Sequence, residues 1–323
     1  MAGNRPVAHE KPLKRVGPRG SGEYEEISWE EAMSTAVGWL TELHETAPHK
    51  LAFFTGRDQS QSFTSFWAQH FGTPNYAAHG GFCSVNMAAA GIYTMGGAFW
   101  EFGQPDWDHT KLFMIFGVAE DHDSNPIKAG IGKIKARGAK VIGVNPVRSG
   151  YNAVADEWVG ITPGTDGLFI LSLVHELMKA GKIDLHYLAQ YTNAAVLVDA
   201  ETGLLMRDAD GKQLVIDRKT GKPAPFDKKG VRPDLSATYR QAGVTHRTVM
   251  HLMAEKYLDP QYAPENVAEK TGISARKIKT IAAELARVAF DEAFELEQEW
   301  TDFRGEVHKT MTGRPVSFHA MRG

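Results

Sequence analysis

The sequence contains a single cysteine, Cys83, among its 323 residues. One cysteine excludes an internal disulfide and fits a reducing compartment. It also means that this chain alone cannot build a cysteine-ligated iron–sulfur cluster or a four-cysteine zinc site. A lone cysteine is most often a small buried apolar residue, so a functional role for Cys83 needs independent support.

Long apolar runs and a large charge imbalance are also missing. No run of 18 apolar residues occurs, so we expect no direct membrane insertion. The first 20 residues are polar and basic, and they match neither a signal peptide nor a twin-arginine signal. The net charge of −3 does not indicate a nucleic-acid partner. Hydrophobic residues make up 42% of the chain, enough for a sizeable core in about two domains.

Short apolar runs alternate with helical patterns over the first 180 residues. Ser28 and Glu31 form a capping-box pattern before a helix. Alternation with short loops predicts an α/β fold with a doubly wound, mostly parallel sheet. The buried strands that we expect cover 50–54, 112–116, 140–144 and 159–161, and the later helices cover 61–70, 84–91, 127–137 and 166–180.

The second half of the chain has a different character. A hairpin is expected at 196–206 and a strand at 212–218. The Lys-, Pro- and Gly-rich stretch 218–233 predicts an irregular surface excursion, whose charges we interpret as a solvated face. From Thr245 onward the pattern is helical, and 313–319 indicates a loop that enters a strand. The expected domains are an arm with the first helix (1–48), the α/β domain (49–193), an inserted hairpin region (194–244) and a helical segment returning to the α/β domain (245–323).

Polar or glycine-rich segments follow the predicted strands, at 55–58, 117–125, 145–150 and 162–167. Ligands of doubly wound sheets bind beyond the carboxyl ends of the strands, so this clustering predicts a nucleotide-like ligand. The alternative is that loops are polar on any protein surface. The GxGxxG, GxxxxGK and HExxH motifs are all absent, which disfavours an ordinary nicotinamide dehydrogenase.

Cys83 follows two glycines and precedes an Ala-rich segment of helical character. The positive end of a helix dipole and the free amides there favour the thiolate form. A thiolate is a preferred ligand of soft metals. The local sequence therefore indicates a metal ligand without identifying the metal.

Six segments in order resemble the molybdopterin guanine dinucleotide oxidoreductases of the dimethyl sulfoxide reductase family. The resemblance covers about 11–193 without a break and returns at 313–323. The stretches 55–61 and 80–86 most resemble the catalytic subunits of cytoplasmic sulfite dehydrogenases. The six segments are 12–32, the strand leading to 55–57, 83–91, 116–126, 138–158 and 163–167.

The resemblance implies that Cys83 binds a molybdenum or tungsten ion held by two molybdopterin guanine dinucleotides. His79 and Arg57, together with His122, are candidates for proton or anion handling, although a lone histidine is more often structural. Asp166 is expected at a guanine edge and Arg148 at a pyrophosphate. The alternatives are a helix N-cap for Asp166 and a surface charge for Arg148. The implied cofactor-binding residues are Gly117, Asp121, His122, Asn125, Asn145, Pro146, Arg148, Gly164, Thr165 and Asp166.

The chain departs from the family at both ends. Members usually carry an iron–sulfur segment of four cysteines before the region that matches 12–22, and they continue several hundred residues beyond His319. We therefore expect a truncated member, incomplete relative to the family, that does not itself ligate the family's iron–sulfur cluster.

The implied activity is a two-electron oxygen-atom transfer on a small inorganic oxyanion, with sulfite oxidation favoured. The expected partners are an iron–sulfur electron-transfer subunit, together with a membrane anchor subunit, in the cytoplasm at the inner face of the membrane. Formate is less favoured, because Ser84 follows Cys83 where formate dehydrogenases typically have histidine. The alternatives are a member like the formate dehydrogenases or the polysulfide, thiosulfate or nitrate reductases, and a non-catalytic cofactor-binding fragment.

Overall fold

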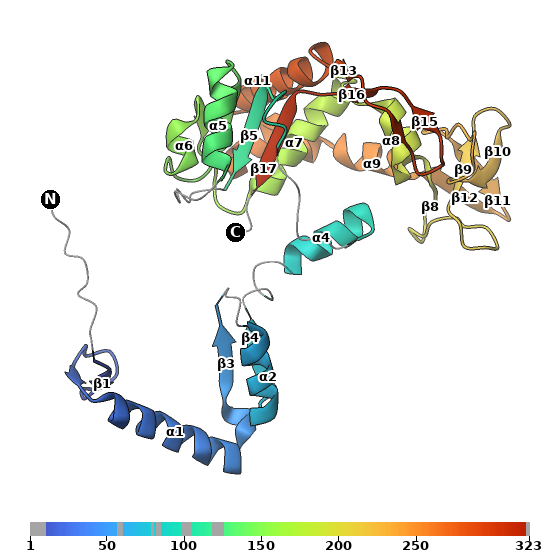
Figure 1. Ribbon diagram of the computed structural model, residues 1–323. Helices are drawn as coiled ribbons and strands as arrows, with labels where there is room; N and C mark the ends of the chain where they lie inside the picture. Colours follow the sequence, from blue (N-terminus) through green and yellow to red (C-terminus); the bar gives the residue numbers. More distant parts are fainter. Residues whose placement is uncertain are drawn as a thin grey trace. The chain divides into compact units, whose positions relative to one another are not determined.

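The computed structural model describes residues 11–56, 61–78, 81, 85–97, 105–117 and 126–320. The chain divides into two compact units, Met1–Phe102 and Gly103–Met321, which are described separately (Figure 1). Among the helices of the described ranges, none combines the length and the hydrophobicity that a membrane span requires.

The first unit begins with the antiparallel strands β1 (Leu13–Arg15) and β2 (Tyr24–Glu26), followed by helix α1 (Trp29–Thr46). The predicted cap of α1 is confirmed, because the Glu31 amide donates to Ser28 Oγ at 3.1 Å. The Glu31 carboxylate, expected to complete the capping box, instead pairs with Lys14 Nζ at 2.9 Å. The helix start is therefore tied to the preceding hairpin.

A parallel strand pair, β3 (Ala52–Thr55) and β4 (Asn75–Ala78), forms the rest of the first unit with three helical segments. The prediction that this strand is buried is wrong for Phe54, which is 69% exposed. Phe53 instead contacts the rings of Trp67 and Tyr76, so α2 covers one face of this narrow sheet. The helical segments are η1 (Pro48–Lys50), α2 (Gln61–Phe71) and α4 (Val85–Met95).

The second unit is built on a four-stranded parallel sheet in the order β17-β5-β6-β7. The predicted doubly wound α/β fold is thereby confirmed. The fourth predicted strand begins two residues earlier than expected, at Glu157, because its pairing with β6 starts at Ile142. The strands are β5 (Leu112–Phe116), β6 (Lys140–Val144), β7 (Glu157–Val159) and β17 (Val316–Ala320).

Helices cover both faces of this sheet (Figure 1). Alternate residues of β5 enter two different cores: Leu112 and Met114 lie in one, and Phe113 and Ile115 lie in the other. The first core is shared with α7 (Asp166–Lys179), α10 (Pro264–Thr271), α11 (Ala275–Ala286) and the π-helical turn η4 (Arg287–Asp291). The second is shared with α5 (Pro126–Ala136) and α6 (Tyr151–Val154).

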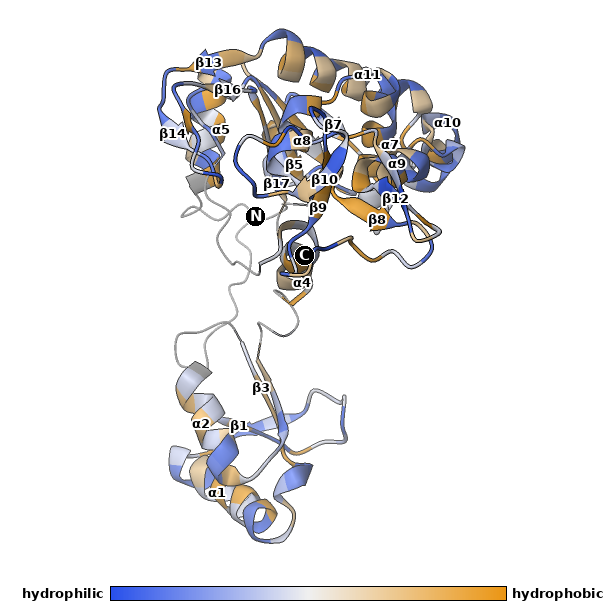
Figure 2. Ribbon diagram, turned by 90° about the vertical axis from the view of Figure 1, so that its right-hand side faces the viewer, coloured by the Kyte–Doolittle hydropathy of each residue, from blue (hydrophilic) through white to orange (hydrophobic). Residues whose placement is uncertain are grey.

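A separate set of short strands and helices follows α7, and its strands β8 and β9 carry the hydrophobic colour in Figure 2. Two expectations are wrong here: β10 lies inside the stretch expected to be irregular, and β12 precedes the helices expected from Thr245. These elements are α8 (Leu185–Tyr191), η2 (Asn193–Ala195), β8 (Leu197–Asp199), β9 (Leu214–Asp217), β10 (Lys222–Pro225), β11 (Thr238–Gln241), β12 (Val244–Thr248), α9 (Val249–Tyr257) and η3 (Pro260–Tyr262). Before β17 come β13 (Phe294–Leu296), β14 (Trp300–Thr301), β15 (Val307–His308) and β16 (Met311–Gly313).

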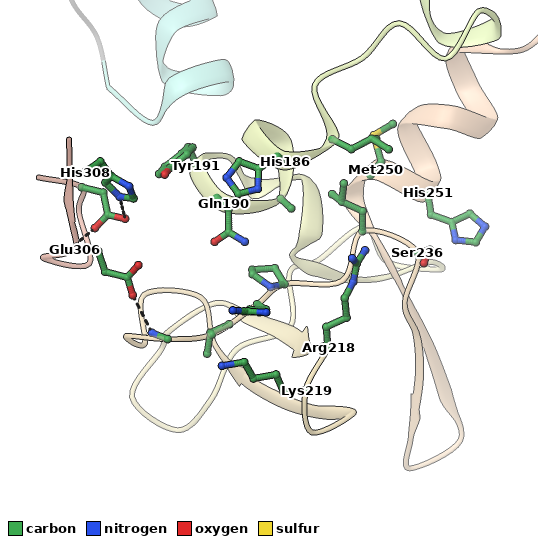
Figure 3. Close-up of a pocket in the computed structure, with 18 of the residues that line it drawn as sticks. His186, Gln190, Tyr191, Arg218, Lys219, Ser236, Met250, His251, Glu306 and His308 are labelled. Carbon is green, nitrogen blue, oxygen red and sulfur yellow. Dashed lines mark hydrogen bonds and ion pairs between the residues drawn. The ribbon is translucent and has the colours of Figure 1, made fainter. Parts of the chain in front are cut away.

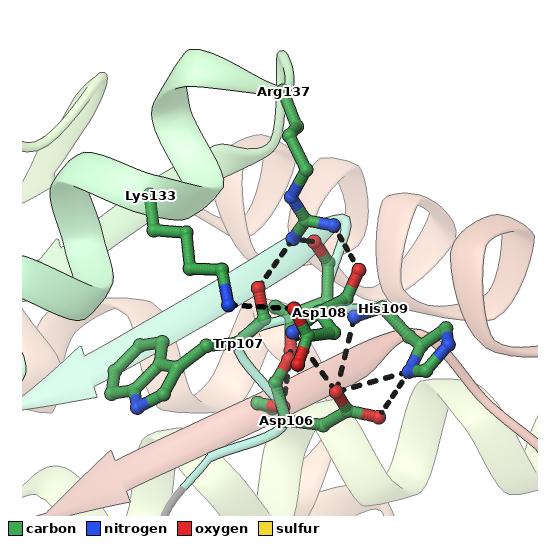
Figure 4. Close-up of polar contacts among 8 residues, drawn as sticks. Asp106, Trp107, Asp108, His109, Lys133 and Arg137 are labelled. Atoms are coloured by element: carbon green, nitrogen blue, oxygen red, sulfur yellow. Dashed lines mark hydrogen bonds and ion pairs between the residues drawn. The ribbon is translucent and has the colours of Figure 1, made fainter.

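Paired charges surround the amino ends of the parallel strands. The turn before β5 is bound to α5, where Arg137 Nη2 donates to the Trp107 carbonyl at 2.7 Å and Lys133 pairs with Asp108 at 2.6 Å (Figure 4). Asp106 closes the same turn by accepting the His109 amide at 3.1 Å. These groups bond to one another, which assigns them a structural role.

The start of β6 shows the same pairing. Lys140 Nζ lies 2.9 Å from the Glu157 carboxylate and 2.6 Å from that of Glu284. Burial raises the pKa of Glu157, but the hydrogen bonds from Lys140 and Lys277 outweigh burial and hold that pKa below its usual 4.5. The carboxylate therefore stays ionised and links β6, β7 and α11.

Gly143 in β6 should be intolerant of a side chain. A Cβ added there would lie 2.2 Å from Asn152 Oδ1 and 3.2 Å from the Asn152 backbone, so α6 would have to move. We expect Gly143→Ala to lower the free energy of unfolding by about 1–3 kcal/mol in urea titrations. The control is Gly132→Ala in α5, where an added Cβ would have no described atom within 4 Å apart from its chain neighbours and the backbone of its own helix. That variant should be neutral or more stable by up to about 1 kcal/mol, and equal losses in both variants would contradict the packing argument.

Candidate functional site

The carboxyl ends of the parallel strands lie along one edge of the sheet. The ladder continues one residue past β5 and β6, because the Gly117 amide donates to the Val144 carbonyl at 3.0 Å and the Asn145 amide to the Val159 carbonyl at 3.1 Å. Gly117 then turns the chain with a φ of +68°, which a residue with a side chain rarely adopts. Gly117 and Asn145, both predicted site residues, are therefore neighbours at the position where doubly wound sheets bind ligands.

The turn after β6 is fixed by Asn145, which is 4% exposed. Its Oδ1 accepts the Val147 amide at 3.1 Å, and its carbonyl accepts Trp158 Nε1 at 2.9 Å. Pro146 and Arg148 are exposed on this rigid turn. Within the described ranges the Arg148 side chain forms no hydrogen bond or ion pair, so its guanidinium is available to an anion.

The loop after β7 leads into the start of α7. Gly164 has a φ of +80°, and Thr165 bonds back to the Thr162 carbonyl through both its amide (3.2 Å) and its Oγ1 (2.7 Å). Asp166 is the first residue of α7, whereas Thr165 is the N-cap, so the alternative of an N-cap role for Asp166 is wrong. The Asp166 carboxylate has no hydrogen-bond or ion-pair partner among the described residues. It is a free acceptor at the sheet edge.

His319 was not among the predicted site residues. It lies one residue before the end of β17 and pairs with Ile115 of β5. Its Nε2 is buried and has no hydrogen-bond partner in the described part of the chain, and burial lowers its pKa below 6.5. The sequence signal was a histidine near the end of a predicted strand. That signal could indicate a site residue only if the strand with which it pairs were known.

The two ends of the sheet thus differ in how their charged and polar groups are satisfied. Those at the amino ends pair with one another, as Lys140 does with Glu157. In the described ranges, Arg148, Asp166 and the Nε2 of His319 at the carboxyl end have no protein partner. Of these groups only His319 Nε2 is buried, and a buried polar atom without a partner costs about 1–3 kcal/mol, which a bound ligand can recover.

The remaining predicted site residues lie outside the described ranges. They are Arg57, His79, Cys83, Asp121, His122 and Asn125. Their roles stay predictions.

Comparison with known proteins matches a family model described as molybdopterin oxidoreductase to residues 9–291. The chain is 45% identical to a sulfite dehydrogenase subunit of Allochromatium vinosum, over 97% of this chain and 34% of that protein. It is 29% identical to the thiosulfate reductase molybdopterin-containing subunit PhsA of Salmonella typhimurium, over 59% of this chain and 25% of that protein. The chain therefore spans about a third or less of these relatives' length.

Among solved structures, acetylene hydratase from Pelobacter acetylenicus aligns with a TM-score of 0.48 and 18% identity. The alignment covers 87% of this chain and 30% of that one.

His319 should make stability depend on pH. Its folded pKa lies below 6.5, so the unfolded chain takes up the proton first and stability falls as the pH drops below about 6.5. We expect His319→Leu to reduce the loss of unfolding free energy between pH 7.5 and pH 5.0 in urea titrations. His186→Leu, at an exposed position, is the control. An unchanged pH dependence in His319→Leu would show that the imidazole is not held neutral by burial.

Proposed function

Because the chain belongs to the molybdopterin oxidoreductase family, we propose that it forms part of a catalytic subunit, and that the carboxyl edge of its parallel sheet holds a molybdopterin guanine dinucleotide. The observation that carries this proposal is the contrast between the paired charges at the amino ends of the strands and the unpaired groups at their carboxyl ends. The proposed oxidoreductase activity is that of a whole protein, and the relatives are about two to three times as long as this chain.

The groups at the edge suit the chemistry of a guanine dinucleotide. The Asp166 carboxylate can accept the two N–H groups of a guanine edge, and the Arg148 guanidinium can pair with a pyrophosphate oxygen. The amides at the start of α7 favour an anionic group nearby. The neutral imidazole of His319 can donate to or accept from a polar ligand atom, which would satisfy its buried Nε2.

The metal centre belongs to the same proposal. Cys83 would provide a thiolate ligand to molybdenum or tungsten, and His79 and Arg57 would handle a proton and an anion. The bound metal and its two pterin cofactors supply two-electron redox chemistry. The further cofactor contacts that we propose are Asp121, His122 and Asn125, together with Pro146 and Thr165 of the turns already described.

The proposed substrate is a small inorganic oxyanion, with sulfite as the first choice. Its support is the 45% identity to a protein named as part of a sulfite dehydrogenase, and a relative named as part of a perchlorate reductase supports the wider oxyanion class. The relatives are named as subunits, so we propose an iron–sulfur partner subunit, together with a membrane anchor subunit, at the inner face of the cytoplasmic membrane. The iron–sulfur cluster would be ligated outside this chain, because Cys83 is its only cysteine.

The cofactor proposal predicts the nucleotide content of the protein. The chain, produced in cells that make the cofactor, should release guanine nucleotide on acid hydrolysis in stoichiometric amount. We expect Arg148→Gln and Asp166→Asn each to lower that content about tenfold, since each removes a charged hydrogen bond worth about 1.5–3 kcal/mol. Arg240→Gln, at another exposed arginine, is the control. A folded chain without metal or nucleotide would support the alternative of a non-catalytic fragment.

The metal-ligand proposal predicts a separate loss. We expect Cys83→Ser to abolish sulfite-dependent reduction of ferricyanide and to lower the molybdenum or tungsten content measured by mass spectrometry, because a hydroxyl is a poor ligand for a soft metal. The folded secondary structure, followed by circular dichroism, should stay unchanged. Full metal content with full activity in this variant would refute the ligand assignment. If the metal-loaded chain oxidises formate or reduces thiosulfate and does not oxidise sulfite, the proposed substrate changes from sulfite to that compound.

A further inference from the structure

A cavity lies in the second unit, in a part of the chain that the proposed function does not use. Its volume is about 950 Å³. Its walls are α8, the turn between β9 and β10, the segment 230–236, α9 and the β14–β15 hairpin (Figure 3). This is the size of a small-molecule site.

Three cationic residues line this cavity, and one buried carboxylate positions their backbones. Asp217, 8% exposed, accepts the amides of Lys219 and Arg232 at 3.2 Å each. The Arg218 amide donates to the Arg232 carbonyl at 2.8 Å. These bonds hold two loops together that are separated in sequence, so Arg218, Lys219 and Arg232 form one basic wall. Figure 3 shows Arg218 and Lys219 among the residues that line the cavity.

Two carboxylates, Asp217 and Asp234, lie next to the three cations of the basic wall. Arg218 approaches Asp234 only to 3.8 Å, and its side chain is 65% exposed. In the described part of the chain, the side chains of Lys219 and Arg232 have no hydrogen-bond or ion-pair partner. The three cations outnumber these two carboxylates, so the basic wall can attract an anion.

The acidic residues of the cavity lie on the β14–β15 hairpin and already have partners. Asp302 accepts the amides of Arg304 and Glu306 at 2.9 Å each and lies 3.3 Å from His308 Nε2. The Glu306 carboxylate accepts the Gly230 amide at 3.2 Å. Asp302 therefore stabilises the hairpin turn and Glu306 ties the hairpin to the Gly230 segment, and the negative charge of both residues disfavours an anion at that end of the cavity.

Apolar side chains complete the lining. Ala189, Val231 and Leu235 are 7–8% exposed and belong to one hydrophobic cluster, against which Met250 of α9 packs. An inorganic anion would leave this apolar surface in contact with water. A ligand with an apolar body would cover it and gain from the burial.

We propose that this cavity binds an organic anion, with a phosphate-type head on the basic wall of Arg218, Lys219 and Arg232 and an apolar body against Val231, Leu235 and Met250. Three of the cations in 218–233 then form a binding surface, whereas the sequence analysis interpreted all of them as a solvated face. This site is separate from the sheet edge and does not depend on the proposed cofactor.

The test uses the full chain and phenyl phosphate in isothermal titration calorimetry at low salt. We expect saturable binding that weakens at least tenfold in the triple variant Arg218→Gln/Lys219→Gln/Arg232→Gln, whose positions are all exposed and should not affect folding. The matched control, Lys222→Gln/Lys228→Gln/Lys229→Gln, removes the same charge from exposed lysines that do not line the cavity. It should keep the affinity of the wild type.

Two further arms make the proposal falsifiable. Inorganic phosphate should bind at least fivefold more weakly than phenyl phosphate, and equal affinities would refute the apolar part of the site. Arg148→Gln/Asp166→Asn should bind phenyl phosphate as the wild type does, and a loss there would place the ligand at the sheet edge. Absent binding, or equal losses in the two triple variants, would overturn the proposal.

Discussion

The parallel hydrogen-bond ladder through β17, β5, β6 and β7 is the constraint on which the second unit depends. It places alternate residues of β5 in two apolar cores, so helices are required on both faces. It also ends every strand at the same edge, where chain turns replace strand pairing. The groups proposed to hold the cofactor are neighbours for this reason alone, since Gly117, Asn145 and His319 come from three distant parts of the sequence.

Local patterns were sufficient for the elements that bury both faces. The bounds expected for β5 agree with the structure, and α7 ends within one residue of its prediction. These segments are apolar throughout or strongly periodic, and their flanking glycines mark the ends. Burial of β3 could not be predicted, because an apolar run does not reveal how many strands and helices will cover it. Phe54 shows the difference.

The candidate site divides in the same way. The loops after β5, β6 and β7 begin at one edge as predicted, because parallel topology requires it. The prediction is wrong for 55–58, which follows β3 of a separate two-stranded sheet. His319 was missed, since its value arises from a partner strand far away in the sequence. The cations of 218–233 were assigned to solvent for a related reason. Composition cannot reveal that a buried carboxylate, Asp217, gathers Lys219 and Arg232 on one wall.

The position of β17 has a consequence for how the protein is made. Its residues pair with β5 residues more than two hundred positions earlier in the chain. During synthesis β5 leaves the ribosome long before β17 has been made. Until then, the backbone N–H and C=O groups of this fully apolar strand that later pair with β17 have no partner strand. Exposed edges of this kind invite pairing with other nascent chains. Closure of the long loop between the two strands is therefore expected to be a slow, late step of folding.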